Sequence, residues 1–109
     1  MQPDLPEPAP ITPRIREVIN VLFLEADRAE AERLLFEDCG RNLPFCEDYQ
    51  SEDLDRFRLA ALKLSRGRLD KLIEAICLAQ TDWRDLLMAA DFGHDVKAHL
   101  KWKPTRSGA

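Results

Sequence analysis

The chain has too few glycines and histidines for several common kinds of functional site. Only four of its 109 residues are glycine, and none of them belongs to a glycine-rich phosphate loop. The two histidines, His94 and His99, are five residues apart and therefore do not share a helical face as an i, i+4 metal pair would. HExxH and GxSxG motifs are also absent. We therefore predict that the protein is not an enzyme and has no catalytic residues, cofactor or metal.

Cysteine is scarce as well, and the three cysteines lack the spacing of a metal site. Six residues separate Cys39 from Cys46, and no two cysteines form a CxxC pair. An odd number of cysteines, in a chain long enough to fold by apolar packing, favours a reducing compartment. We expect all three, Cys77 included, to act as small hydrophobic residues. The alternative is a zinc site completed by His94 or His99.

Long hydrophobic runs are missing too. No run approaches the ~20 apolar residues that a membrane-spanning helix needs. The first thirty residues lack a basic segment followed by an apolar stretch and a small-residue cleavage site, so we do not expect export. Apolar residues make up 45% of the chain, which is too many for a disordered protein and enough for one core. We predict a cytoplasmic protein that does not contact membranes.

The hydrophobic pattern that is present has the period of helices, and no stretch alternates for long enough to form a strand. Five of the seven prolines fall in the first thirteen residues, where they exclude a helix or a central strand before Pro13. The predicted fold class is all-α, a compact bundle of five to six short helices. The predicted division is a Pro-rich N-terminal arm at 1–11, a single helical domain at 12–103 and a C-terminal tail at 104–109.

Capping residues and glycines mark where the helices should begin and end. Thr12 can cap a helix that has Pro13 at its first position and an apolar stripe that reaches Leu22. Asp27, with a glutamate three residues later, resembles a capping box for a second helix, and Gly40 suits the left-handed position after its end. The later helices are expected to begin at Ser51 or Asp53, at about residue 68, after Thr81, and at Asp95.

The segment from about 68 to 80 is the most apolar of these helices. Within Leu72–Ala79 only Glu74 is polar. A helix that is apolar nearly all round is usually surrounded by other helices, so we place this one at the centre of the bundle. Trp83 lies on the apolar stripe of the next helix, and we expect it to be buried against the central one.

Several strings in the chain resemble a group of small bacterial proteins of uncharacterised function. The most specific string is Thr81–Leu87, TDWRDLL, followed by Ala89 and Ala90. The stretches Phe57–Ser65 and Cys39–Cys46 belong to the same pattern. The resemblance covers about two-thirds of the chain and implies a bacterial source and one self-contained unit. It implies no activity, ligand or site.

Charge is distributed unevenly along the chain. Residues 1–55 hold 14 acidic and 5 basic residues, a net charge of −9, and residues 56–109 hold 6 acidic and 11 basic residues, a net charge of +5. We expect antiparallel packing to neutralise this difference between neighbouring helices. Otherwise the surface is bipolar, and it can steer a partner or promote head-to-tail self-association.

The basic residues are densest just after residue 55. The candidate interaction patch comprises Arg56, Lys63, Arg66, Arg68 and Lys71. Such a patch can contact phosphates, so a nucleic-acid-binding module that uses residues 56–71 is the alternative function. Two acids within Thr81–Asp85 lie where a recognition helix would approach DNA, and the net charge of the chain is −4. For these reasons we do not expect a nucleic-acid partner.

Asp38 is the acid that stands out among many solvated ones. It falls on the inner arc of its helix and near the C-terminal end, where a negative charge is disfavoured. A buried acid with a shifted pKa is one interpretation. The expected one is an acid at a frayed helix end, paired with Arg41, Arg58 or Arg84. With no catalytic set in view, we predict a non-catalytic protein–protein interaction or regulatory module that binds an unknown protein or a second copy of itself.

Overall fold

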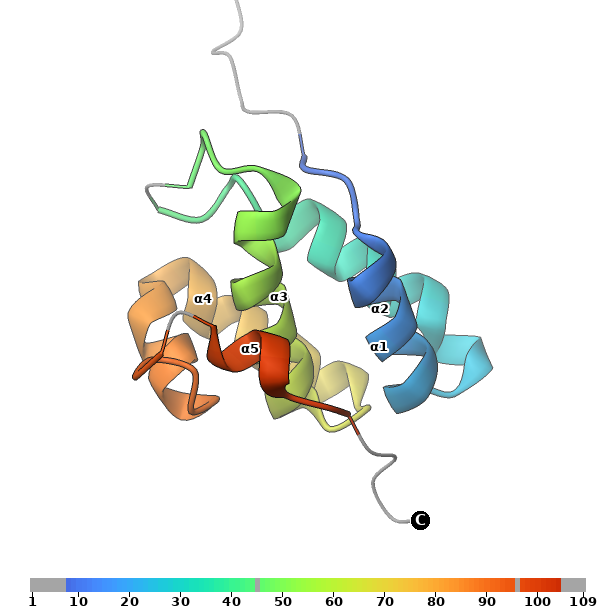
Figure 1. The fold of residues 1–109 in the computed structure, drawn as a ribbon. Coiled ribbons are helices and arrows are strands. Elements are labelled where there is room, and N and C mark those ends of the chain that lie inside the picture. Colours follow the sequence, from blue (N-terminus) through green and yellow to red (C-terminus); the bar gives the residue numbers. More distant parts are fainter. Residues whose placement is uncertain (1–7, 45, 96, 105–109) are drawn as a thin grey trace, which may run out of the picture.

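The computed structural model describes residues 8–44, 46–95 and 97–104, and all regular structure within them is helical. The helices are α1 (Pro13–Leu22), α2 (Glu25–Asp38), α3 (Ser51–Ser65), α4 (Leu69–Ala89) and α5 (Ala98–Lys101) (Figure 1). The predicted all-α bundle of short helices is confirmed. Most of the predicted arm and tail, residues 1–7 and 105–109, lies outside the described residues. In the part of the chain that is described, no helix has the length and apolar character needed to cross a membrane.

Helix α3, not α4, lies at the centre of the molecule. Nine of the 15 residues of α3 are buried, and α3 packs against α1, α4 and α5 (Figure 1). The prediction that segment 68–80 is surrounded was wrong. Its residue Ile73 is 47% exposed and Cys77 is exposed, because α4 packs mainly on α2 and α3 and turns its remaining side to solvent.

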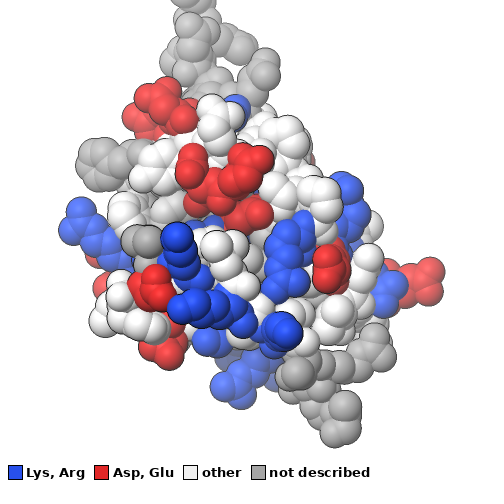
Figure 2. Space-filling model, viewed as in Figure 1, with Lys and Arg blue, Asp and Glu red and all other residues white. Residues whose placement is uncertain are grey.

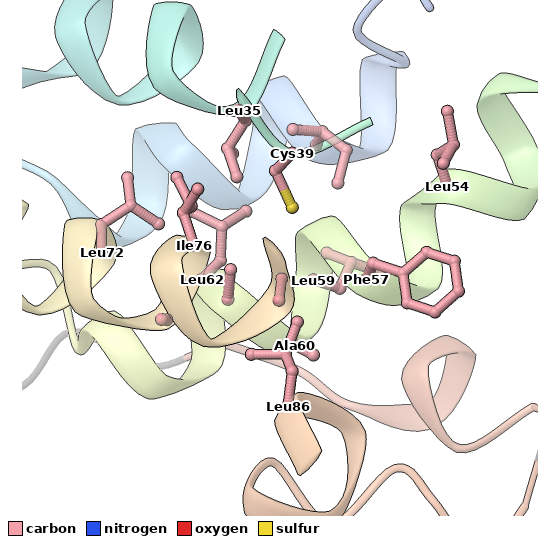
Figure 3. Packing of buried hydrophobic residues seen from close by; sticks show 14 of the residues in the cluster. Leu35, Cys39, Leu54, Phe57, Leu59, Ala60, Leu62, Leu72, Ile76 and Leu86 are labelled. Carbon is pink, nitrogen blue, oxygen red and sulfur yellow. The ribbon is translucent and has the colours of Figure 1, made fainter. Parts of the chain in front are cut away.

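The core forms where α2, α3 and α4 meet. Figure 3 shows apolar side chains from these three helices converging on one another. The fully or almost fully buried members include Leu35, Cys39, Leu54, Leu59, Leu62, Leu72 and Leu86. Removing such side chains from water supplies the main driving force for folding.

Helix α1 begins as the sequence predicts, and α2 does not. The Thr12 hydroxyl accepts a hydrogen bond from the Ile15 amide at 3.3 Å, as an N-cap residue does. Helix α2 begins at Glu25, before Asp27, and has no side-chain cap. Gly40 does not adopt the left-handed conformation. Its lack of a side chain serves a different purpose, since a Cβ there would lie 2.8 Å from Nη2 of Arg58.

The two segments predicted as separate helices on either side of residue 81 are one element with a break. Asp82 has φ −157° and ψ 100°, which is not helical. Its carboxylate accepts a hydrogen bond from the Arg84 amide at 3.0 Å, so Asp82 is the cap of the second half. The predicted cap, Thr81, donates its hydroxyl to the Cys77 carbonyl at 3.0 Å instead. The capping residue of α3 also differs from the prediction. It is Gln50, and its backbone amide donates a hydrogen bond to the Asp53 carboxylate.

A buried arginine holds the segment before α1 against α3. Arg58 is 0% exposed and donates hydrogen bonds to the carbonyls of Cys39 (2.8 Å), Pro10 (3.1 Å) and Ala9 (3.0 Å). Ala9 is itself 0% exposed. The described end of the proline-rich segment is therefore part of the folded unit, because a guanidinium group has enough donors to bind three carbonyls at once.

Candidate functional site

The structure does not assemble the predicted basic patch into one surface. Arg56 Nη2 donates to the Phe92 carbonyl at 2.9 Å, and Lys63 Nζ donates to the Ala90 carbonyl at 2.8 Å. Lys63 also lies 4.9 Å from the centre of the Phe92 ring. Both cations therefore stabilise the C-terminal end of α4, where unpaired carbonyls and the helix dipole favour positive charge.

The other three members of the patch lie at the turn between α3 and α4. Arg66 is exposed, Arg68 pairs with Asp70 at 3.0 Å, and Lys71 pairs with Glu74 at 3.2 Å. These surface pairs contribute little to stability, but they reduce the local positive charge. The patch is divided between two places in the fold.

A different site does form, at the N-terminal end of α3. A hollow with a volume of about 440 Å³ lies there between α3, the second half of α4 and α5. Three aromatic residues line it: Tyr49, Phe57 and Trp83. Phe57 stacks on Tyr49 with 6.1 Å between the ring centres and meets the edge of Trp83 at 5.1 Å. The hollow therefore has an apolar floor made of rings held by one another.

Trp83 is less buried than predicted and packs on α3 rather than on the first half of α4. Its side chain is half-buried, and Nε1 donates a hydrogen bond to the Pro44 carbonyl at 3.0 Å. The break at Asp82 sets this orientation because it begins a new helical stretch just before the indole. Leu86, Leu87 and Ala90, which follow Trp83 on the second half of α4, are buried.

Acidic residues border the hollow on one side. Glu52 and Asp53 line it from the first turn of α3, and Glu47 and Asp48 are exposed in the loop that precedes this helix. We call these four residues the acidic pole. Arg56 lines the same hollow, and its buried Nε has no hydrogen-bond partner within the described structure. This nitrogen is buried, so it is not open to a molecule that enters the hollow.

Basic residues lie on and beside α5. Lys97, Lys101 and Lys103 are exposed, and Arg14 reaches this region from α1 by donating to the Trp102 carbonyl at 2.7 Å. We call these four residues the basic pole. Trp102 is half-buried and meets the Phe92 ring edge-on at 6.2 Å, so it packs on the domain as the last core residue does in a small fold.

The ion pairs do not neutralise one half of the chain with the other. Within the described residues, all eight ion pairs join residues of the same half, such as Arg16 with Glu32 and Lys101 with Asp95. Opposite charges of the two halves nevertheless meet in α3, where buried Asp55 and Arg58 attract each other. Figure 2 shows one face, with a group of acidic side chains in its upper half, a band of lysine and arginine side chains in its lower half, and further acidic side chains beside that band at the left and right.

The buried ionisable residues are not the ones that the sequence singled out. Asp38 is partly exposed, whereas Asp55 is 9% exposed and accepts hydrogen bonds from the Thr12 hydroxyl at 2.8 and 3.0 Å. Burial raises the pKa of Asp55 and lowers the pKa of Arg58. The sequence signal was available, because both residues lie on the same face of α3 as buried leucines. A run of charged residues nevertheless predicts a solvent-exposed helix face when the position of the helix in the fold is unknown.

The three cysteines differ in how far they are buried. Cys39 and Cys46 are buried, and burial raises the pKa of Cys39 to about 12 and that of Cys46 to about 11. Both thiols thus stay protonated and behave as small apolar groups. Cys77 is exposed, contrary to the prediction. Among the described residues, no three His, Cys, Asp or Glu side chains gather in a group that could hold a metal ion.

No protein-family model, curated protein or solved structure matches this chain.

Proposed function

We propose that the protein is a non-catalytic, cytoplasmic protein-interaction module and that the hollow is its docking site. The supporting observation is the aromatic floor formed by Tyr49, Phe57 and Trp83, with the carboxylates of Glu52 and Asp53 beside it. Protein interfaces are centred on a few anchor side chains that enter apolar pockets, and polar groups surround them. A hollow of about 440 Å³ has room for such an anchor.

The residues around the floor define the chemistry of the partner. The acidic pole attracts positive charge, so basic residues are expected next to the anchor side chain. The proposed ligand is therefore a peptide segment with an apolar anchor between lysines or arginines.

This proposal is tested by titrating the protein with a short peptide that has one leucine between lysines. The indole N–H signal of Trp83 in an NMR spectrum is the readout, because this ring lines the hollow. We expect the signal to move with the lysine peptide and not with a matched peptide in which glutamates replace the lysines.

Two double variants test whether the peptide binds at the hollow. Asp48→Lys with Glu52→Lys changes the net charge of the acidic pole from −4 to zero and leaves Asp53, which accepts a hydrogen bond from the Gln50 backbone amide, in place. This variant should weaken peptide binding at least tenfold, by about 1.4 kcal/mol or more. Glu25→Lys with Glu74→Lys changes the net charge equally, on α2 and on the first half of α4, and should leave binding unchanged. Equal binding of both peptides, or equal loss in both variants, would contradict the proposal.

Nucleic-acid binding through residues 56–71 is the alternative function, and the contacts of its residues do not support it. Arg56 and Lys63 are occupied with backbone carbonyls, and Arg68 and Lys71 pair with acids. A bound phosphate would have to displace these partners.

A further inference from the structure

The molecule carries, next to the hollow, a segment with the chemistry that the hollow requires. Leu100 on α5 is 64% exposed, and lysines lie on both sides of it at positions 97, 101 and 103. Leu24 is also exposed, at 68%, so exposure alone does not distinguish Leu100. What distinguishes it is its place between basic residues beside an aromatic hollow that acidic residues border, which makes it a candidate anchor.

A copy of the chain cannot place its own α5 in its own hollow. His99 of α5 is buried and lines the hollow from one side, with its ring 6.4 Å from that of Phe92. Trp102, just after α5, is fixed by Phe92 and by the hydrogen bond from Arg14. These contacts hold the helix beside the hollow, with Leu100 turned outward.

We propose that a second copy of this chain fills the hollow with its α5, in a two-fold symmetric dimer. The proposal rests on the function proposed for the hollow and names its partner. The acidic pole is at the N-terminal end of α3, which lies above α5 in Figure 1, and the basic pole is at α5. In the same view, Figure 2 shows acidic side chains above and basic ones below.

A face with an acidic end and a basic end is complementary to itself. A two-fold axis that lies in the interface, between the two poles, turns one copy over and reverses the direction from acidic to basic. Each acidic pole then meets the basic pole of the other copy, and each Leu100 lies opposite the other hollow. The same contact forms twice, which is the property of a closed two-fold interface.

The opposing charges are available for this contact. No ion pair in the described structure involves Glu47, Asp48, Glu52 or Asp53, nor Lys97 or Lys103. Lys101 has one long pair, to Asp95 at 3.4 Å, and this pair is exposed. Pairing between copies would therefore break few contacts within a copy, and it would place opposite charges together at both ends of the interface.

Analytical ultracentrifugation of three proteins tests the dimer. The first is the unaltered chain, expected to dimerise at micromolar concentration and about 50 mM salt, and to dissociate at least partly at about 500 mM salt because added ions screen exposed charges. The second is Asp48→Lys with Glu52→Lys. The third is Lys97→Glu with Lys103→Glu. Each variant removes the net charge of one pole and places two like charges opposite the other copy's pole at both contacts, and we expect dimerisation to weaken at least tenfold.

Mixing the two variants is the decisive measurement. In a mixed pair, the lysines introduced at positions 48 and 52 of one variant meet the glutamates introduced at positions 97 and 103 of the other, and the second contact is unaltered. We expect a mixed dimer with an affinity within about threefold of the unaltered protein, since charge complementarity is restored. The control Glu25→Lys with Glu74→Lys should dimerise normally. Circular dichroism of each variant verifies that the fold is retained.

Several results would overturn the proposal. They are an unaltered chain that stays monomeric at hundreds of micromolar and low salt, a dimer that tolerates either reversal, and a mixture that stays monomeric. If the chain is monomeric and the lysine peptide still moves the Trp83 signal, the partner is a different protein and the proposed function stands. If the peptide fails as well, both proposals are wrong.

Discussion

Arg58 is the residue with the largest structural role in this chain. It is fully buried, and its three hydrogen bonds join the segment before α1, the end of α2 and the centre of α3. Asp55, one turn earlier on the same helix, is the other charged residue in this region and bonds to Thr12. Burial of both charges is tolerated because their polar atoms are paired.

Replacing Arg58 tests this role. Arg58→Met keeps much of the side-chain volume but leaves the carbonyls of Ala9 and Cys39 without their donor. We expect the free energy of unfolding to fall by about 3–5 kcal/mol, as happens when one partner of a buried polar group is removed. Arg68→Met, which breaks only an exposed ion pair, should change it by less than about 1 kcal/mol. Urea denaturation measures the change in unfolding free energy for each variant. Similar changes in the two variants would contradict the structural role given to Arg58.

At the scale of elements, the turns depend on backbone conformations that particular residues allow. Helix α3 ends with Arg66 at φ 52° and Gly67 at φ 81°. A Cβ at Gly67 would collide with the Leu22 carbonyl, so α1 and the α3–α4 turn approach as closely as they do only because this residue is glycine. Gly93 lies in another turn, where a Cβ would meet mainly the flexible sulfur of Met88.

These two glycines give a matched comparison. Gly67→Ala should lower the free energy of unfolding by about 2–4 kcal/mol, because the positive φ and the backbone collision both oppose a side chain. Gly93→Ala should cost less than about 1 kcal/mol, since the exposed Met88 side chain can move aside. Thermal unfolding of both variants is the measurement. A larger loss at Gly93 would show that the close approach at Gly67 is not important for stability.

At the scale of the whole molecule, the ion pairs of the described residues form within each half of the chain. Single cations still cross over, since Arg14 belongs to the basic pole and Arg56 lines the hollow beside the acidic pole. The acidic pole repels phosphate, and the basic residues of segment 56–71 are divided between two places. A surface of this kind is expected to bind an oppositely charged protein face better than a polyanion.

Nucleic-acid binding is therefore expected to be weak. We predict no binding to generic DNA or RNA tighter than about 10 μM at about 150 mM salt, as measured by fluorescence anisotropy. Weak binding at low salt alone would agree with this prediction, because any local cluster of cations can produce it. Sub-micromolar binding at that salt concentration, abolished by Arg66→Glu with Arg68→Glu in a folded protein, would contradict the proposed function and support the alternative.

The sequence by itself determined the features that depend on neighbouring residues. The helical fold class, the Thr12 cap with Pro13 after it, and the inner faces that contain Ile15 and Leu35 follow from local spacing, since a helix places residues three and four apart on one side. The break near residue 81 was also visible, although its cap is Asp82.

Only the tertiary structure decided which helix is central, which charges are buried and where a site forms. Helix α4 is more apolar than α3, yet α3 lies in the middle because it has partners on three sides. The burial of Arg58 and the assembly of Tyr49, Phe57, Trp83 and His99 around one hollow join residues far apart in the sequence. Periodicity gives the face of a helix that turns inward, but it carries no information on which other segment that face meets.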